Sequence, residues 1–180
     1  MMIFHRLGLI NKGQRGFTLI ELIMAIAVAG VIGGGVTTTI FQTFDYNARS
    51  TARMTAVKQL ENTVHWISRD AQMAQTVVPT EAPDLDGFPL ILTWVEWDNT
   101  ENEVTYSISM AGDELKRSHS EDGGVPSETV VASFINNDPA MTNCAFAGGV
   151  LTFTLTATVG YGSSQEASET RVCEVVPRPN

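Results

Sequence analysis

Glu21 is the only charged residue in an apolar stretch that begins at Phe17 and ends at Val36. A helix rises about 1.5 Å per residue, so the 20 residues of this stretch reach about 30 Å, the thickness of a bilayer's hydrocarbon core. An ionised side chain at that depth costs about 2.5–3.5 kcal/mol. A glutamate kept there therefore needs a chemical reason, and the residues before it supply one.

The residues before the apolar stretch are basic. Residues 1–16 contain Arg6, Lys12 and Arg15 and no acid, whereas the whole chain has a net charge of −9. A basic start followed by an apolar run is the layout of an export signal. The positive-inside rule places this start in the cytoplasm and the residues after Thr39 outside. We therefore expect a single-pass protein of the inner membrane, in contact with lipid, with an extracytoplasmic C-terminal head. The net negative charge argues against direct nucleic-acid binding.

The segment "RGFTLIEL", residues 15–22, resembles the processing site of type IV prepilins and of type II secretion pseudopilins, which carry a class III signal peptide. The resemblance implies that prepilin peptidase cuts between Gly16 and Phe17 and N-methylates Phe17. It also implies that Glu21, the fifth residue of the mature chain, acts in filament assembly. The implied partners are other pilin or pseudopilin subunits, prepilin peptidase and the inner-membrane assembly platform.

Cleavage would give Glu21 a partner, because it creates an α-ammonium group on Phe17 near the apolar layer. Pairing relieves the cost of burying either charge alone. Glu21 lies about one helical turn from Phe17, so a pair within one chain is possible. The resemblance implies instead a pair with the N-terminus of a neighbouring subunit. A protonated Glu21 that reaches toward the headgroups is the alternative.

Four glycines lie in the second half of the apolar stretch: Gly30, Gly33, Gly34 and Gly35. Gly30 and Gly34 form a GxxxG spacing, which permits close helix contact in membranes. Each glycine also costs about 1 kcal/mol of helix propensity. We favour a flexible segment over a dimer face, since four glycines exceed what a contact needs.

Residues 36–78 contain neither Gly nor Pro, which predicts one uninterrupted helix that ends near Val78. An apolar stripe at spacings of 3 and 4 consists of Met54, Val57, Leu60, Val64, Ile67, Ala71 and Ala74. A wet face consists of Lys58, Glu61, Asn62, Arg69, Asp70 and Gln72. The predicted organisation is a cleaved leader at 1–16, a transmembrane or filament-core helix at 17–40, its amphipathic half at 41–78 and a head at 79–180.

The head is predicted to be an antiparallel β-sheet, because apolar and polar residues alternate in "EVTYSISM" (103–110) and "GVLTFTLTATVGYG" (149–162). Further strands are expected in 88–98, 115–120, 128–136 and 169–176. Trp94 and Trp97 are three apart, so one is expected in the core and the other at a contact surface. The fold class is therefore α+β, a pilin-like ladle in which the helix's apolar stripe packs on the sheet.

Arg69-Asp70, Tyr106 and Leu115-Lys116-Arg117 are similar to a pattern of J-type minor pseudopilins and W-type minor pilins. This resemblance implies a non-enzymatic structural subunit that helps prime or cap a type IV pilus or a type II secretion pseudopilus. A major type IV pilin is the first alternative. A signal-anchored extracytoplasmic domain that never assembles is the second.

Two cysteines, Cys144 and Cys173, lie in the extracytoplasmic part, where a disulfide is the natural expectation. Two unpaired buried thiols are the alternative. The histidines have no metal-ligand spacing, so neither a catalytic site nor a cofactor is expected. The segment "DLDG" offers Asp84 and Asp86 as weak calcium candidates without the later ligands of an EF-hand.

Overall fold

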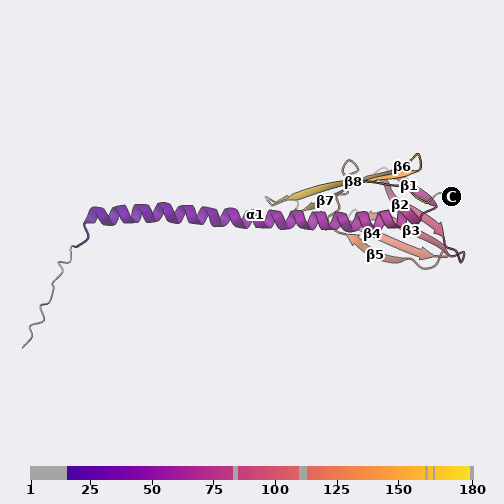
Figure 1. The fold of residues 1–180 in the computed structure, drawn as a ribbon, viewed down its shortest axis with the longest axis horizontal. Helices are drawn as coiled ribbons and strands as arrows, with labels where there is room; N and C mark the ends of the chain where they lie inside the picture. The colour runs from indigo at the N-terminus through magenta and orange to yellow at the C-terminus, as the bar shows by residue number, and fades with distance from the viewer. Residues whose placement is uncertain (1–15, 83–84, 110–112, 161, 164, 179–180) are drawn as a thin grey trace, which may run out of the picture. The chain divides into compact units, whose positions relative to one another are not determined.

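The computed structural model describes residues 16–82, 85–109, 113–160, 162–163 and 165–178. In this part of the chain one helix, α1 (Leu19–Met73), precedes eight strands (Figure 1). The strands are β1 (Thr76–Ala82), β2 (Leu85–Val95), β3 (Glu101–Ser109), β4 (Glu114–Glu121), β5 (Ser127–Ala132), β6 (Asn143–Ala147), β7 (Val150–Val159) and β8 (Ala167–Val175). The chain divides into two compact units, Met1–Phe44 and Asp45–Asn180, and α1 contributes to both.

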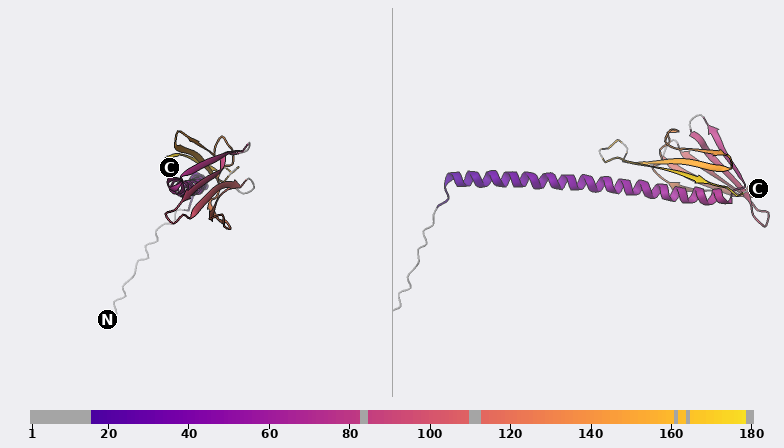
Figure 2. Two further views of the ribbon diagram at one scale, coloured as in Figure 1. Left: turned by 90° about the vertical axis from the view of Figure 1, so that its right-hand side faces the viewer. Right: turned by 45° about the horizontal axis from the view of Figure 1, so that its top comes forward.

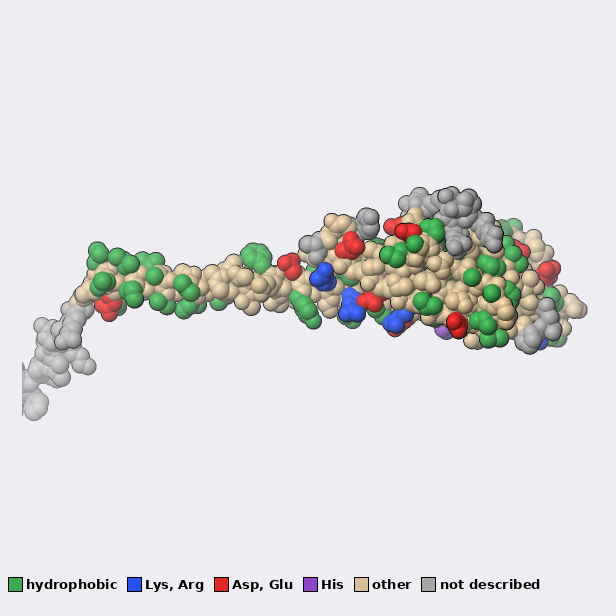
Figure 3. All heavy atoms as spheres, turned by 90° about the horizontal axis from the view of Figure 1, so that it is seen from above, with side chains coloured by type: hydrophobic (Ala, Val, Ile, Leu, Met, Phe, Trp, Pro, Cys, Tyr) green, Lys and Arg blue, Asp and Glu red, His purple; other side chains and the backbone are tan. Residues whose placement is uncertain are grey.

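In the first unit α1 is long and apolar enough to cross a membrane, and none of its apolar window is buried. On the face that Figure 3 shows, hydrophobic side chains gather on the N-terminal end of this helix, and an acidic side chain lies among them. The helix continues through the glycine cluster without a break. The predicted spanning segment is therefore helical, as expected from its composition.

The second unit contains two antiparallel sheets where the sequence had suggested one. The first sheet has the order β1-β2-β3-β4-β5 and the second has the order β6-β7-β8. Within each sheet the strands pair in chain order, so both sheets are simple meanders. An isolated bridge between Ile135 and Ala157 connects the segment after β5 to β7. The predicted α+β class with an antiparallel head is confirmed.

The helix ends five residues earlier than predicted, at Met73 instead of Val78. The predicted last turn instead contributes to β1, where Val77 pairs with Leu92 and Val78 with Ile91. Two physical reasons favour a strand here. Thr76, Val77 and Val78 are β-branched, and Pro79 disfavours a helical conformation at the residue before it.

The strands of the second unit pack beside the C-terminal half of α1 (Figure 2). The buried residues of α1 are Ala56, Leu60, Thr63, Ile67, Asp70 and Ala71. They repeat at spacings near 3 and 4, as predicted, but the buried face is rotated from the predicted stripe. Met54 is 71% exposed, while polar Thr63 and Asp70 are fully enclosed. The polar residues of this face form hydrogen bonds inside the protein. The pattern of hydrophobic residues alone therefore did not predict which face of the helix is buried.

The strands present one apolar face to the helix. On β3 the side chains of Asn102, Val104, Tyr106 and Ile108 are buried, and those between them are more exposed. On β7 the predicted alternation of Leu151, Phe153, Leu155 and Ala157 is also buried. Trp94 belongs to the core, whereas Trp97 lies beyond the end of β2 and is 94% exposed. The expected difference in burial between the two tryptophans is confirmed, and a contact role for Trp97 stays a prediction.

Candidate functional site

The predicted cleavage site lies just before the helix. Gly16 and Phe17 have no regular secondary structure, and the Phe17 side chain is 84% exposed. The helix begins at Leu19, and the Thr18 carbonyl accepts hydrogen bonds from the amides of Glu21 (3.1 Å) and Leu22 (3.2 Å). A peptidase needs an accessible bond outside a helix, and the Gly16–Phe17 bond meets that condition.

Thr18 is the N-cap of α1, a role that the sequence reasoning missed. Its Oγ1 accepts a hydrogen bond from the Glu21 amide at 3.4 Å and donates one to Glu21 Oε2 at 3.5 Å. A threonine followed three residues later by a glutamate, ahead of an apolar run, is the signature of a capping box. Glu21 is thus exposed and has a local role in the helix start, which is compatible with a second role toward a neighbouring amine.

The glycine cluster is helical and fully exposed. A Cβ atom added at Gly30, Gly33, Gly34 or Gly35 would meet no heavy atom within 4 Å. The hydroxyls of Thr37, Thr38 and Thr39 donate to the carbonyls of Gly33, Gly34 and Gly35 at 2.8–2.9 Å. These bonds give each threonine hydroxyl a hydrogen-bond acceptor, which the hydrocarbon of a membrane would not provide. Nothing in the packing of the single chain requires glycine at these positions.

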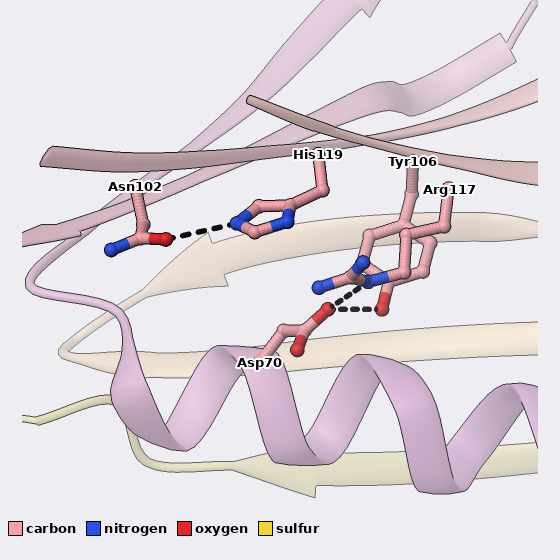
Figure 4. Close-up of polar contacts among 5 residues, drawn as sticks. All are labelled: Asp70, Asn102, Tyr106, Arg117 and His119. Carbon is pink, nitrogen blue, oxygen red and sulfur yellow. Dashed lines mark hydrogen bonds and ion pairs between the residues drawn. The ribbon is translucent and has the colours of Figure 1, made fainter. Parts of the chain in front are cut away.

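Asp70, Tyr106 and Arg117 meet in the interior of the second unit (Figure 4). Asp70 projects from α1 and is 1% exposed. Its Oδ2 accepts a hydrogen bond from the Tyr106 hydroxyl and another from Arg117 Nε, each at 2.6 Å. Asp70 was predicted on the wet face of the helix, and that prediction is wrong, because strands β3 and β4 supply partners for its charge. We call these three residues the Asp70 cluster.

The Asp70 cluster is electrically balanced. Burial and the negative charge of Asp70 raise the pKa of Tyr106 well above its usual value, so the hydroxyl remains a donor. Burial would lower the pKa of Arg117, but its hydrogen bond to Asp70 and the charge of Asp70 raise it overall. The guanidinium group of Arg117 also lies 5.2 Å from the ring centre of Trp66, a cation–π contact.

The Asp70 cluster joins elements instead of forming an open reactive site. In the described residues, no buried side-chain nitrogen or oxygen lacks a hydrogen-bond partner. The helix is also fixed to β5, through the bond from Asn62 Nδ2 to the Val131 carbonyl, and to the residue just after β5, through the bond from the Ser133 amide to Gln59 Oε1. These bonds hold the helix at one position along the sheet.

The calcium candidates stay a prediction, and the histidine of the head domain makes other contacts. His119 bonds through Nε2 to Asn102 Oδ1 at 2.9 Å (Figure 4). Its ring also stacks on Trp94. Among the residues that the structure describes, no group of three or more metal-ligating side chains comes together. The calcium candidates cannot be placed, since Asp84 and the side chain of Asp86 lie outside the described part.

The sheet register contradicts the predicted disulfide. Cys144 on β6 and Cys173 on β8 both pair with Phe153 on β7, so a whole strand separates them. Adjacent strands lie about 4.8 Å apart, which puts the two Cα atoms about 10 Å apart, beyond the limit of about 7 Å for a disulfide. The Cys144 thiol instead donates a hydrogen bond to the Gly87 carbonyl at 2.8 Å. Burial raises the pKa of the Cys173 thiol.

A long N-terminal helix followed by antiparallel strands defines an α+β architecture of the pilin-like kind. In a comparison with protein families, residues 11–37 match the prokaryotic N-terminal methylation motif. The match contains Gly16, Phe17, Glu21 and the glycine cluster, and supports the resemblance to type IV prepilins. The motif indicates that the chain is a substrate of prepilin peptidase, in the manner of pilins and pseudopilins. Comparisons with curated proteins and with solved structures give no match.

Proposed function

We propose that this chain is a minor pilin or pseudopilin that helps prime or cap a type IV pilus or a type II secretion pseudopilus. Prepilin peptidase cuts between Gly16 and Phe17 and methylates the new N-terminus. The mature subunit stays in the inner membrane through its apolar helix, with the head outside the cytoplasm, until it enters the filament.

One observation carries this proposal: the matched methylation motif, residues 11–37, runs into α1, whose apolar window has no buried residue. A soluble protein does not leave so much apolar surface in water. Lipid in the membrane, and neighbouring helices in a filament, are the two surroundings that would cover it. Cleavage of the exposed Gly16–Phe17 bond is the processing step between the membrane-bound precursor and the filament subunit.

The assignment to the minor class is supported by the Asp70 cluster. Asp70, Tyr106 and Arg117 come from the three short motifs on which the resemblance to J-type and W-type subunits is based. Their contact supplies a structural reason for that pattern, because the two hydrogen bonds connect the helix to the sheet. The separation of Cys144 from Cys173 also disfavours the disulfide loop that a major pilin often carries.

The partners in this function are sister pilin-like subunits, prepilin peptidase and the inner-membrane assembly platform. Glu21 is proposed to pair with the N-terminal amine of a neighbouring subunit during assembly. The exposed glycines are proposed to let neighbouring helices approach or the helix unwind locally. Both roles suit surfaces that the single chain leaves open.

Substitution of Glu21 separates a pilin from a plain membrane anchor. Glu21→Leu removes the charge and suits a spanning helix at least as well, so an anchored domain would remain in the membrane and function. A pilin-type subunit with this change would remain in the membrane but fail to enter sheared filaments. Glu174→Gln, an exposed change on β8, is the matched control for loss of one carboxylate. Incorporation of Glu21→Leu at the wild-type level would refute the pairing role.

A further inference from the structure

Trp97 has no partner in the core and stands out from the end of the first sheet. It lies in the turn between β2 and β3 and is 94% exposed. Val125, in the neighbouring turn between β4 and β5, is 95% exposed. A backbone hydrogen bond from Asp122 to the Glu101 carbonyl (2.8 Å) joins the second turn to the start of β3. Large side chains exposed to this degree gain substantial free energy when a partner covers them.

A hollow of about 520 Å³ lies beside Trp97. Its lining includes Met73 at the end of α1, Trp94 and Val95 of β2, Glu96 and Trp97 of the turn, and Arg178 near the C-terminus. The Arg178 amide donates to the Ala74 carbonyl at 3.1 Å, and Gln75 Oε1 accepts from the Val95 amide at 3.2 Å. One backbone bond and one backbone–side-chain bond therefore join the elements that line the hollow, which is a surface feature of the second unit.

Acidic residues outnumber basic ones at this end of the first sheet. Glu96 and Asp98 flank Trp97 in the chain, and Glu101, Glu121 and Asp122 occupy the adjoining strand ends. Hydrogen bonds from the backbone and side chain of Thr100 lower the pKa of Asp98, which keeps it ionised. Of these five acids Glu96 lines the hollow, where the cation Arg178 also lies. We call Trp97 with Glu96, Asp98, Glu101, Glu121 and Asp122 the acidic rim.

We propose that the acidic rim is a docking surface for a basic segment of a partner polypeptide. A lysine or arginine side chain of the partner lies over the Trp97 indole as a cation–π contact, with the flanking carboxylates around it. The apolar part of that segment enters the hollow against Met73 and Val95. Tryptophan is among the residues that most often dominate a protein interface, and the surrounding charge steers the approach of a basic partner.

The same test distinguishes a separate basic partner from a second copy of this chain. Exposed basic side chains, Arg49, Arg53 and Lys58, lie on the first turns of α1 in the second unit, at the opposite end from Trp97. Figure 3 shows Lys and Arg side chains gathered there. The Arg53 charge is already engaged with Glu169 at 2.6 Å. We therefore favour a separate basic partner.

The test uses the full chain in non-ionic detergent and a fluorescent peptide of repeated Gly-Lys-Gly units, with a Gly-Glu-Gly peptide as the opposite-charge probe. Fluorescence anisotropy is measured at low and high salt. The variants are Trp97→Ala, Trp97→Phe and the double change Glu96→Gln with Asp98→Asn. Val172→Ala and Glu174→Gln on β8 are the matched controls, because both residues are exposed and lie on the second sheet, whereas Trp97 adjoins the first. Circular dichroism confirms that each variant is folded.

We expect the Lys peptide to bind and the Glu peptide not to bind. Trp97→Ala is expected to weaken binding about tenfold or more, and Trp97→Phe less, since phenylalanine keeps an aromatic face. The double carboxylate variant is expected to weaken binding and flatten its dependence on salt, while the two controls bind as wild type. The proposal is overturned if Trp97→Ala binds like wild type, or if the Lys peptide does not bind at low salt. Self-association that depends on Trp97, without peptide binding, also overturns it in favour of a second copy.

Discussion

The most informative perturbation of the head is Asp70→Asn, which removes a buried charge without changing the shape of the side chain. Asp70 is 1% exposed and accepts two hydrogen bonds of 2.6 Å, one of them from the cation Arg117. Loss of one partner of a buried ion pair costs about 3–5 kcal/mol, because the other charge stays buried. Arg117 keeps 15% of its side-chain surface exposed and its contact with Trp66, which relieves part of that cost.

We therefore expect Asp70→Asn to lower the free energy of unfolding by about 3 kcal/mol. At about 2–4 °C per kcal/mol, the melting temperature falls by about 6–12 °C. The assay is thermal and urea unfolding of the full chain in detergent, followed by circular dichroism and tryptophan fluorescence. Trp66 lies against Arg117 and reports on the cluster itself.

Glu169→Gln is the matched control. The Arg53–Glu169 ion pair has the same nitrogen–oxygen distance, 2.6 Å, but 70% of the arginine side-chain surface is exposed. Exposed pairs contribute about 0–1 kcal/mol, so this variant should unfold almost like wild type. A cost below about 1 kcal/mol for Asp70→Asn, or equal costs for the two variants, would refute the account of the Asp70 cluster.

Three further predictions follow from particular side chains. Tyr106→Phe should reduce stability at neutral pH. Because the pKa of Tyr106 is raised in the folded state, the wild type should lose this advantage as pH rises above about 10, seen in urea unfolding at several pH values. Cys173→Ser should cost less than about 1 kcal/mol in the same assay, since Phe153 separates the cysteines, whereas losing a native disulfide costs about 2–5 kcal/mol. Gly87→Ala should cost about 2 kcal/mol or more, since φ is +86° and a new Cβ would lie 1.9 Å from the Cys144 carbonyl oxygen. Wild-type urea midpoints for Gly87→Ala would contradict the close approach.

The sequence predicted the features that depend on local pattern. The length and composition of the apolar stretch predicted the spanning helix. The processing site was predicted from the resemblance of residues 15–22 to prepilins, and its cleavage stays a prediction. Alternation along β3 and β7 predicted which side chains enter the core. Trp94 is buried and Trp97 exposed, as predicted, but for a different reason: β2 ends at Val95, so Trp97 lies in the turn after the strand and not on its opposite face.

The features that depend on long-range contacts could not be predicted in this way. Asp70 is polar, so a hydrophobic stripe excludes it, although Tyr106 and Arg117 far along the chain make its burial favourable. Whether the cysteines meet depends on strand order, and the sequence did not reveal that β7 lies between them. The role of Thr18 was missed, even though the capping signature was available in the sequence.

The measurement that tests the central claim most directly is the mass of the N-terminal peptide of the protein isolated from its native membrane. Our account predicts a chain that begins at Phe17 and carries one additional methyl group on its amine. A chain that still begins at Met1 or Met2, with no methyl group, would contradict the proposed processing and leave a membrane-anchored domain.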